Sequence, residues 1–262
     1  MKRLRSLRTS KGRREEGCFL IEGEKLVGEA LAAEAPVLEL LAVESQAPAL
    51  SARAEAAAES PAITTLSDKE SDRISDTRPP QGCFAVLRDT VPASAEAIEA
   101  LPPAGPATVV ALDGVQDPGN AGALIRVSAA FGVDLVLAGP GTADPVQPKV
   151  VRAATGAWFR VAVARSPDLA IDLRRLADRD FAVLGAWSDG ESVWDTECPE
   201  RRVLVLGNEG GGFSEPVVST LTGRVGVPIA EAVESLNVSV AAGIVLGAWS
   251  REREAGLLQR WL

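Results

Sequence analysis

Histidine and tyrosine are absent from this sequence of 262 residues. Histidine is the side chain that most often serves as a general base, and it is also the commonest metal ligand. Its absence excludes serine–histidine triads, cysteine–histidine dyads and histidine-based zinc sites. Any catalysis must therefore use arginine, lysine, carboxylate, asparagine, serine or cysteine side chains.

Cysteine is scarce as well, and no long hydrophobic run is present. Cys18, Cys83 and Cys198 are far apart and odd in number, so they match neither a zinc-binding spacing nor a disulfide framework. No apolar segment follows the basic N-terminus, and the longest apolar stretch, 238–249, is too short to cross a bilayer. We expect a cytoplasmic protein without a secretory signal, a membrane segment or a metal site.

The basic residues are unevenly distributed. The chain carries 27 Lys and Arg against 36 Asp and Glu, a net charge of −9. Residues 1–14 hold seven basic residues and no acidic one, so the remainder has 20 basic against 36 acidic residues, a net charge of −16. This basic arm can contact the phosphates of a nucleic acid, or it can be a solvated, disordered tail. Charge alone leaves both interpretations open.

Residues 90–106 are rich in alanine and proline and divide the sequence into two parts. Before them, helical spacing in 19–33 and apolar runs at 37–43 and 83–89, which we expect to form strands, predict a small α/β domain. We expect a first domain at 1–92, a linker at 93–106 and a second domain at 107–262.

The second part alternates apolar runs with helical patterns, such as 120–132 and 167–179. Near-continuous apolar strands between helices indicate an α/β fold, with a parallel sheet covered on both faces. Ligands of such sheets bind beyond the carboxyl ends of the strands, where Gly207 and the segment after Asp113 lie. The strands are expected at 107–113, 133–139, 159–164, 181–187, 202–207 and 224–229.

A glycine-rich loop, "LGNEGGGF" (206–213), follows one of these strands. It matches neither the phosphate-binding P-loop nor the dinucleotide-binding fingerprint. It has no lysine, and the carboxylate of Glu209 would repel a phosphate. A cationic ligand without phosphate, such as S-adenosylmethionine, fits better. The alternative is an ordinary glycine-rich turn with an exposed glutamate.

The segment "DPGNAGALIR" (117–126) places polar residues near the same edge of the sheet. Pro118 and Gly119 suggest a turn, and we expect Asn120 to cap the helix that follows. Arg126 lies among mainly apolar neighbours, which favours a functional role. The alternative is a salt-bridged arginine at the edge of the helix.

A third segment, "VESLNVSV" (233–240), follows the last strand. Ser235 or Asn237 is expected to cap a helix at 236–249. The apolar face of this helix is wide enough to pack against the sheet or against a second subunit. The alternative is a buried C-terminal helix with a polar start.

Taken together, these segments resemble a known family. "DPGNAGALIRVSAAFG" (117–132), "LVLGNEGGGFS" (204–214) and "VPIAEAVESLNVSVAAGI" (227–244) are similar, in order and spacing, to the three motifs of the SpoU (TrmH-like) RNA 2′-O-ribose methyltransferases of the SPOUT class. "RTSKGRREEGCFLIEGEKLVGEAL" (8–31) and "PPQGCFAVL" (79–87) resemble the substrate-binding domain that precedes the catalytic domain in many members. Ala230-Glu231 stands where many members carry small residues, so Glu231 and Glu234 either tune substrate choice or face water.

The resemblance implies a catalytic domain with a trefoil knot that binds S-adenosylmethionine between the second and third motifs. It implies a homodimer with the active site near the subunit interface, for which the helix at 236–249 and the helix starting at Asn120 are candidates. By motif position, the cofactor-binding residues are Gly207, Gly211, Val227, Ile229 and Leu236.

The implied reaction transfers a methyl group to a ribose 2′-hydroxyl without a metal. The family's catalytic arginine corresponds to Arg126. Because a guanidinium stays protonated in proteins, a hydrogen-bonding fork that holds a phosphate and the developing oxyanion is easier to explain than a general base. The residues expected to orient Arg126 and the ribose are Asn120, Glu209, Ser235 and Asn237.

The expected partner is RNA, gripped by the basic arm through Arg8, Lys11, Arg13 and Arg14. Ribosomal RNA is favoured over transfer RNA because the N-terminal part resembles that of rRNA-modifying members. The alternatives are a tRNA 2′-O-methyltransferase and an inactive RNA-binding protein of the same fold. A phosphate-dependent nucleotide-binding enzyme is disfavoured by the missing lysine.

Overall fold

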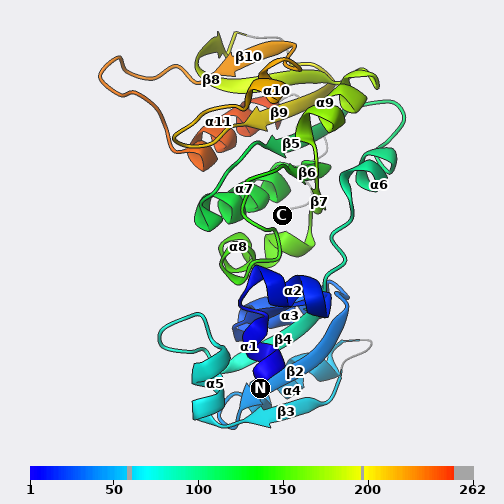
Figure 1. Cartoon of the computed structure of the whole chain (residues 1–262), viewed down its shortest axis with the longest axis vertical. Coiled ribbons are helices and arrows are strands. Elements are labelled where there is room, and N and C mark those ends of the chain that lie inside the picture. Colours follow the sequence, from blue (N-terminus) through cyan, green and yellow to red (C-terminus); the bar gives the residue numbers. More distant parts are fainter. Residues whose placement is uncertain (58–60, 196–197, 251–262) are drawn as a thin grey trace. The chain divides into compact units, whose positions relative to one another are not determined.

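The computed structural model describes residues 1–57, 61–195 and 198–250. The chain forms two compact units, whose elements are labelled in Figure 1. Residues 251–262, the end of the predicted second domain, lie outside the described part of the chain. Unit 1 contains Met1–Thr90 and Val146–Arg160, and unit 2 contains Val91–Pro145 and Val161–Leu262.

Unit 1 is built on a four-stranded sheet in the order β1-β4-β2-β3. β1 and β2 pair antiparallel with β4, and β3 pairs parallel with β2. The strands expected at 37–43 and 83–89 are confirmed as β2 and β4. The elements are α1 (Lys2–Ser6), α2 (Ser10–Glu16), β1 (Cys18–Glu22), α3 (Glu24–Ala32), β2 (Val37–Val43), α4 (Ala47–Glu55), β3 (Ile63–Leu66), α5 (Asp68–Ile74), β4 (Cys83–Arg88), α8 (Pro148–Ala154) and the 3₁₀ helix η1 (Thr155–Phe159).

The prediction of helical structure across 19–33 is wrong in its first part. Residues Cys18–Glu22 form β1, all five of them buried, and α3 begins only after Gly23. Gly23 has a φ of +111°, which favours glycine, and the chain passes there from strand to helix. Because both faces of β1 are covered, its sequence lacks the alternation that identifies a half-buried strand.

The basic arm is ordered rather than a disordered tail. Leu4 and Leu7 are buried in the core of unit 1. Gly12 donates its backbone N–H to Thr9 Oγ1 at 3.1 Å at the start of α2. A Cβ at Gly12 would lie 2.1 Å from the carbonyl oxygen of Ser6, so glycine is what allows α2 to fold back against α1.

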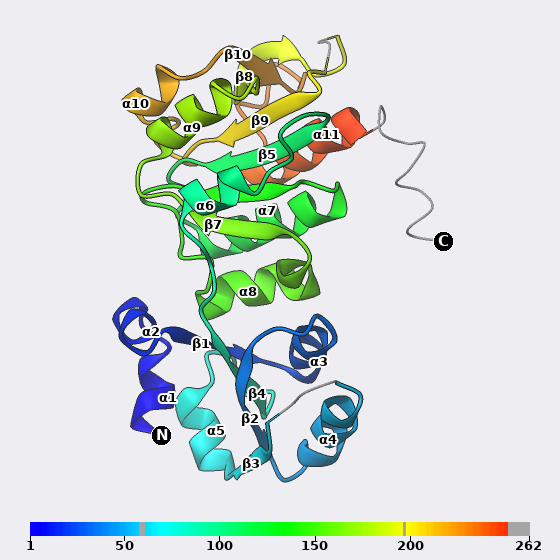
Figure 2. The ribbon, with the colours of Figure 1, turned by 90° about the vertical axis from the view of Figure 1, so that its right-hand side faces the viewer.

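Unit 2 is built on a six-stranded sheet in the order β10-β8-β9-β5-β6-β7, with every pair parallel. Helices α7 and α11 lie on one face, and α6, α9 and α10 lie on the other (Figure 2). The predicted α/β fold with a parallel sheet is confirmed, and all six expected strands are present. They are β5 (Ala107–Leu112), β6 (Leu135–Ala138), β7 (Ala162–Arg165), β8 (Ala182–Ser192), β9 (Arg201–Leu206) and β10 (Gly223–Gly226), with helices α6 (Ser94–Glu99), α7 (Pro118–Ala130), α9 (Leu169–Ala177), α10 (Glu215–Val218) and α11 (Val238–Ser250).

The alanine- and proline-rich segment at 93–106 contains α6. Ile98 and Leu101 are buried in the core of unit 2, packed with residues of the sheet and α9. Arg179 donates a hydrogen bond of 3.0 Å to the carbonyl of Leu101. This segment is therefore part of the packing of unit 2.

Candidate functional site

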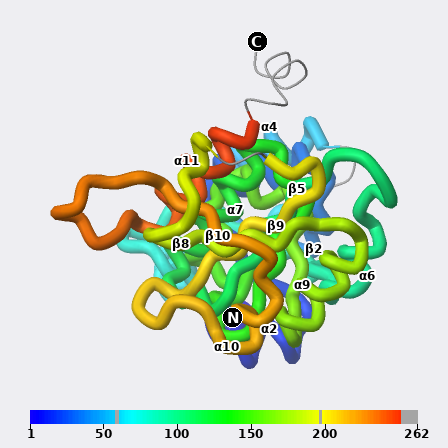
Figure 3. Tube along the Cα trace, turned by 90° about the horizontal axis from the view of Figure 1, so that it is seen from above, coloured from blue at the N-terminus to red at the C-terminus, as the bar shows by residue number. Residues whose placement is uncertain are grey.

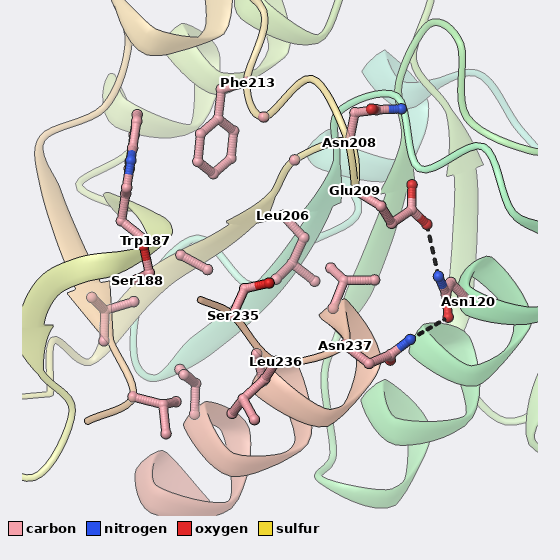
Figure 4. Close-up of a pocket in the computed structure, with 18 of the residues that line it drawn as sticks. Asn120, Trp187, Ser188, Leu206, Asn208, Glu209, Phe213, Ser235, Leu236 and Asn237 are labelled. Carbon is pink, nitrogen blue, oxygen red and sulfur yellow. Dashed lines mark hydrogen bonds between the residues drawn. The ribbon is translucent and has the colours of Figure 1, made fainter. Parts of the chain in front are cut away.

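A pocket of about 560 Å³ lies in unit 2, at the carboxyl ends of β9 and β10 and along residues 186–188 in the middle of β8. The segment 227–237, which joins β10 to α11 and projects from the unit (orange in Figure 3), supplies part of its lining. Figure 4 shows the pocket at close range. It is lined by Asn120, Ala186, Trp187, Ser188, Leu206, Gly207, Asn208, Glu209, Gly212, Phe213, Val225, Val227, Ile229, Ser235, Leu236, Asn237, Val238, Ala241 and Val245.

The glycine-rich loop after β9 closes on itself. Asn208 and Gly212 exchange backbone hydrogen bonds of 2.8 and 2.9 Å. The side-chain oxygen of Asn208 accepts from the backbone N–H groups of Gly210 at 3.0 Å and Gly211 at 2.7 Å. A Cβ at Gly207 would lie 2.8 Å from backbone atoms of Gly212, so this closure requires glycine at 207.

Two side chains fasten this loop to the end of β5. Asn208 donates from Nδ2 to the carbonyl of Gly114 at 2.7 Å. Asp113, only 6% exposed, accepts from the backbone N–H of Ser214 at 2.7 Å and from its hydroxyl at 3.1 Å. Asp113 and Asn208 are not among the site residues expected from the sequence. The sequence feature that could have identified Asp113 is its position as a carboxylate directly after a buried strand.

Three polar side chains from the three motif segments form a row along one side of the pocket. Asn120 donates from Nδ2 to Glu209 Oε1 at 2.8 Å, and Asn237 donates from Nδ2 to Asn120 Oδ1 at 3.0 Å (dashed lines in Figure 4). The side-chain oxygen of Asn237, Oδ1, accepts from the backbone N–H and the hydroxyl of Ser239 at 2.9 and 2.6 Å. We call Asn120, Glu209 and Asn237 the amide row.

The helix caps differ in part from the expectation. Asn237 accepts from Ser239 at the start of α11, as a capping residue does. The prediction that Asn120 caps the other helix is wrong. Asp117 is the N-cap of α7, and its carboxylate accepts from the backbone N–H of Asn120 at 2.9 Å. Asn120 therefore lies inside the first turn, where its side chain is free to join the amide row.

The structure brings together most of the residues expected to bind the cofactor. Gly207, Val227, Ile229 and Leu236 line the pocket, whereas Gly211 does not, and Gly212 lines it instead. Among the expected catalytic residues, Ser235 also lines the pocket, together with the amide row.

Arg126 is not brought to the pocket within this chain. It lies on α7, exposed, and it forms no hydrogen bond or ion pair with the residues that the structure describes. Six residues along an α-helix correspond to a rotation of about 120° and a rise of about 9 Å, so Arg126 faces a different direction from Asn120.

The four residues expected to bind RNA have different environments. Arg13 is 3% exposed and donates to the backbone carbonyls of Leu7 and Arg8 at 3.2 and 3.3 Å, so its guanidinium has a structural role in the arm. Arg8, Lys11 and Arg14 are exposed. No group of three or more potential metal ligands, and no helix able to span a membrane, is found in the described ranges.

A parallel sheet whose strand ends hold a pocket built by three separate segments defines a ligand-binding α/β domain. Residues 107–247 match the SpoU rRNA Methylase family, and residues 1–85 match the MRM3-like substrate binding domain. The chain belongs to the SpoU rRNA methylase family. The family resemblance expected from the three motifs is thereby confirmed.

Individual relatives agree with this assignment. The chain is 32% identical, over 92% of both chains, to the 23S rRNA (guanosine(2553)-2′-O)-methyltransferase RlmP of Bacillus subtilis. It is similar to the structure of a TrmH-family protein from Porphyromonas gingivalis (34% identity, TM-score 0.81, 96% of both chains). It is also similar to the structure of an AdoMet-bound rRNA methyltransferase from Sinorhizobium meliloti (26% identity, TM-score 0.82, 96% of this chain and 94% of that one).

Other curated relatives are longer than this chain. A protein of Mycobacterium avium named as an uncharacterized tRNA/rRNA methyltransferase is 40% identical over 157 residues, which is 60% of this chain and 51% of the relative. The chain thus spans about half the length of the mycobacterial relatives that it matches.

Proposed function

We propose that this protein is an S-adenosylmethionine-dependent RNA methyltransferase that modifies a ribose 2′-hydroxyl, with ribosomal RNA as its substrate. The observation that carries the proposal is the amide row, which borders a pocket of about 560 Å³ with a largely apolar lining. The proposal is supported by the name of the Bacillus subtilis relative, which specifies 2′-O-methylation of 23S rRNA, and by the cofactor bound in the Sinorhizobium meliloti structure.

The residues of the pocket suit this cofactor. Among the residues that the structure describes, Glu209 is the one charged side chain in the lining, and no lysine or arginine lines the pocket. A lone carboxylate favours an organic cation and opposes a phosphate. S-adenosylmethionine carries positive charge on its sulfonium and ammonium groups and has no phosphate. Val227, Ile229 and Leu236 supply apolar contacts from the segment before α11.

When bound, the cofactor supplies an activated methyl group and its own leaving group, so the protein has to position the ribose and stabilise charge on its oxygen. Glu209 fixes the Asn120 amide, and Asn120 fixes Asn237, so the amide row is organised before RNA binds. Ser235 lines the pocket and forms no hydrogen bond within the described part of the chain. Its hydroxyl is therefore available to the substrate.

We propose that Arg126 reaches the site in a homodimer. Its guanidinium is exposed on α7, which packs against α11, and α11 also carries the 50%-exposed Val240. A second copy that packs against these two helices would bring Arg126 of the partner subunit to the amide row. There the guanidinium would hold the RNA phosphate and the developing oxyanion through a hydrogen-bonding fork.

The remaining features of the proposal follow from the family. The catalytic unit would contain a trefoil knot around the cofactor, and the enzyme would act in the cytoplasm. Unit 1 would grip the RNA through exposed basic residues of its arm. Replacing Arg8, Lys11 and Arg14 together with alanine should weaken RNA binding and reduce its dependence on salt concentration, because fewer counterions are released.

Transfer of labelled methyl from S-adenosylmethionine to unmodified rRNA and, in parallel, unmodified tRNA tests the proposed activity. We expect label in rRNA at an alkali-resistant linkage. Activity should fall about 100-fold or more in Glu209→Ala and Asn120→Ala, because each change removes a hydrogen bond that positions the amide row. Label in tRNA alone would reassign the substrate. No label in either RNA, with cofactor binding intact, would favour an inactive RNA-binding protein.

Subunit mixing tests the shared site. Arg126→Ala and Glu209→Ala are each expected to be inactive alone. If Arg126 acts across the dimer, co-expression of the two variants restores about a quarter of the activity, because half of the dimers are mixed and each mixed dimer has one intact site. No recovery in purified mixed dimers would contradict the contribution from a second subunit.

A further inference from the structure

One wall of the pocket is aromatic. Trp187 in β8 and Phe213 at the end of the glycine-rich loop both line the pocket, with ring centroids 4.7 Å apart and planes inclined at 43°. In Figure 4 the two rings lie on the side of the pocket opposite Asn120 and Asn237. We call these two side chains the aromatic wall. The pocket thus has a polar side and an aromatic side.

The aromatic wall is held in place by its surroundings. The guanidinium carbon of Arg224 in β10 lies 4.2 Å from the centroid of the Trp187 ring, a cation–π contact that fixes the orientation of the indole. Arg224 itself does not line the pocket. Phe213 closely approaches the backbone of Gly207, since a Cβ there would lie 3.2 Å from its ring. Both rings are therefore positioned without a ligand.

We propose that the aromatic wall binds the adenine ring of S-adenosylmethionine and so orients the cofactor. This inference rests on the proposed function. The sulfonium has to reach the amide row, where the ribose is methylated. The planar and uncharged part of the molecule then extends toward the opposite side of the pocket, where Trp187 and Phe213 lie. Contact between a base and an aromatic side chain contributes substantially to binding because the π-faces and apolar surfaces match.

Trp187 makes the main contact and Arg224 acts as a positioning residue behind it. The wall therefore contributes equally to binding of S-adenosylmethionine, S-adenosylhomocysteine and adenosine, which share the adenine ring. It contributes nothing to the chemical step, since it lies away from the amide row. Its loss raises the KM for the cofactor and leaves kcat at saturating cofactor unchanged.

Calorimetric titration of the full chain with these three ligands tests the proposal. Trp187→Ala should weaken binding of each ligand by about tenfold or more, within the range measured for base–aromatic stacking. Trp187→Phe should retain most of the affinity, which separates a lost contact from a misfolded protein. Arg224→Ala should weaken binding about threefold, as expected for a cation–π contact that supports the indole. The matched control is Trp194→Ala, because Trp194 is 56% exposed and does not line the pocket.

The outcomes distinguish the possible occupants of the wall. Unchanged affinity of Trp187→Ala for all three ligands would overturn the proposal. An increased KM for RNA with unchanged cofactor affinity would also overturn it, and would assign the wall to the target nucleobase. Failure of the unsubstituted protein to bind S-adenosylmethionine would instead refute the proposed function, and this inference with it.

Discussion

Replacing Asp113 with alanine removes the acceptor that fastens the glycine-rich loop to β5. The carboxylate is 6% exposed and accepts two hydrogen bonds from Ser214, at 2.7 and 3.1 Å. A hydrogen bond to a charged group contributes roughly 1.5–3 kcal/mol. Part of this is recovered because the desolvated charge is removed. We therefore expect Asp113→Ala to destabilise unit 2 by about 3 kcal/mol, which lowers its melting temperature by about 6–12 °C.

Two milder substitutions separate the contribution of the Asp113 charge from that of the Ser214 hydroxyl contact. Asp113→Asn keeps the shape and one acceptor oxygen for the Ser214 N–H, and the Ser214 hydroxyl can rotate to accept from the new amide, so the cost should be about 1 kcal/mol. Ser214→Ala removes only the hydroxyl contact and should also cost about 1 kcal/mol. Because both changes affect the same contact, their combination should cost less than the sum.

The assay combines thermal melting followed by circular dichroism with titration of S-adenosylmethionine. Gly207, Asn208 and Glu209 of the same loop line the pocket, so loosening the loop should weaken cofactor binding as well as stability. RNA affinity carried by the basic arm should not change. A melting temperature and cofactor affinity for Asp113→Ala equal to those of the unsubstituted protein would falsify the reasoning.

Three further substitutions test other features. Gly207→Ala places a Cβ 2.8 Å from the backbone of Gly212 and should abolish cofactor binding in a folded protein, measured by calorimetry; unimpaired binding would contradict the loop geometry. Gly12→Ala forces α2 away from the Ser6 carbonyl and should destabilise unit 1 by about 1–3 kcal/mol, measured by urea unfolding. Burial raises the pKa of the Cys83 thiol to about 11 from 9.0. Since the folded state disfavours the thiolate, the contribution to stability is complete below pH 9 and is lost as the pH rises toward 11. In Cys83→Ala the midpoint of urea unfolding should depend less on pH across that range. The same pH dependence as in the unsubstituted protein would contradict this role of Cys83.

The parallel sheet was predictable because its strands are continuous apolar runs separated by helical patterns. The convergence of the three motif segments was predictable for the same reason. Carboxyl ends of neighbouring parallel strands meet at one edge of a sheet, so residues after β5, β9 and β10 come together whatever their distance in sequence.

Local details were less predictable. Asp117 and Asn120 both suit an N-cap, and the decisive signal was Pro118, which is favoured at the first helical position and so marks Asp117 as the cap. The spacing of Asn120 and Arg126 could have indicated that one helix does not point both side chains into one pocket. That inference required the start of the helix to be known.

The roles of individual charged and aromatic side chains could not be predicted from composition alone. Arg13 belongs to a run of basic residues, yet its guanidinium is buried against the carbonyls of Leu7 and Arg8. Only the turn between α1 and α2 brings these carbonyls to it. The place of Trp187 in the aromatic wall could not be predicted from the sequence. Phe213 and Arg224, which contact it, are distant in sequence and approach it from the glycine-rich loop and from β10.

The division of unit 1 into two stretches of chain has a consequence during synthesis. Trp158 of η1 contacts Phe19 with ring centroids 5.4 Å apart, and Arg152 of α8 forms an ion pair of 2.7 Å with Asp76. A ribosome that adds about 5–20 residues per second reaches Arg160 several seconds after it has completed Thr90. During that interval the nascent sheet has an uncovered apolar surface, which a chaperone can protect. A fragment truncated near Thr90 would keep that surface exposed permanently and should aggregate.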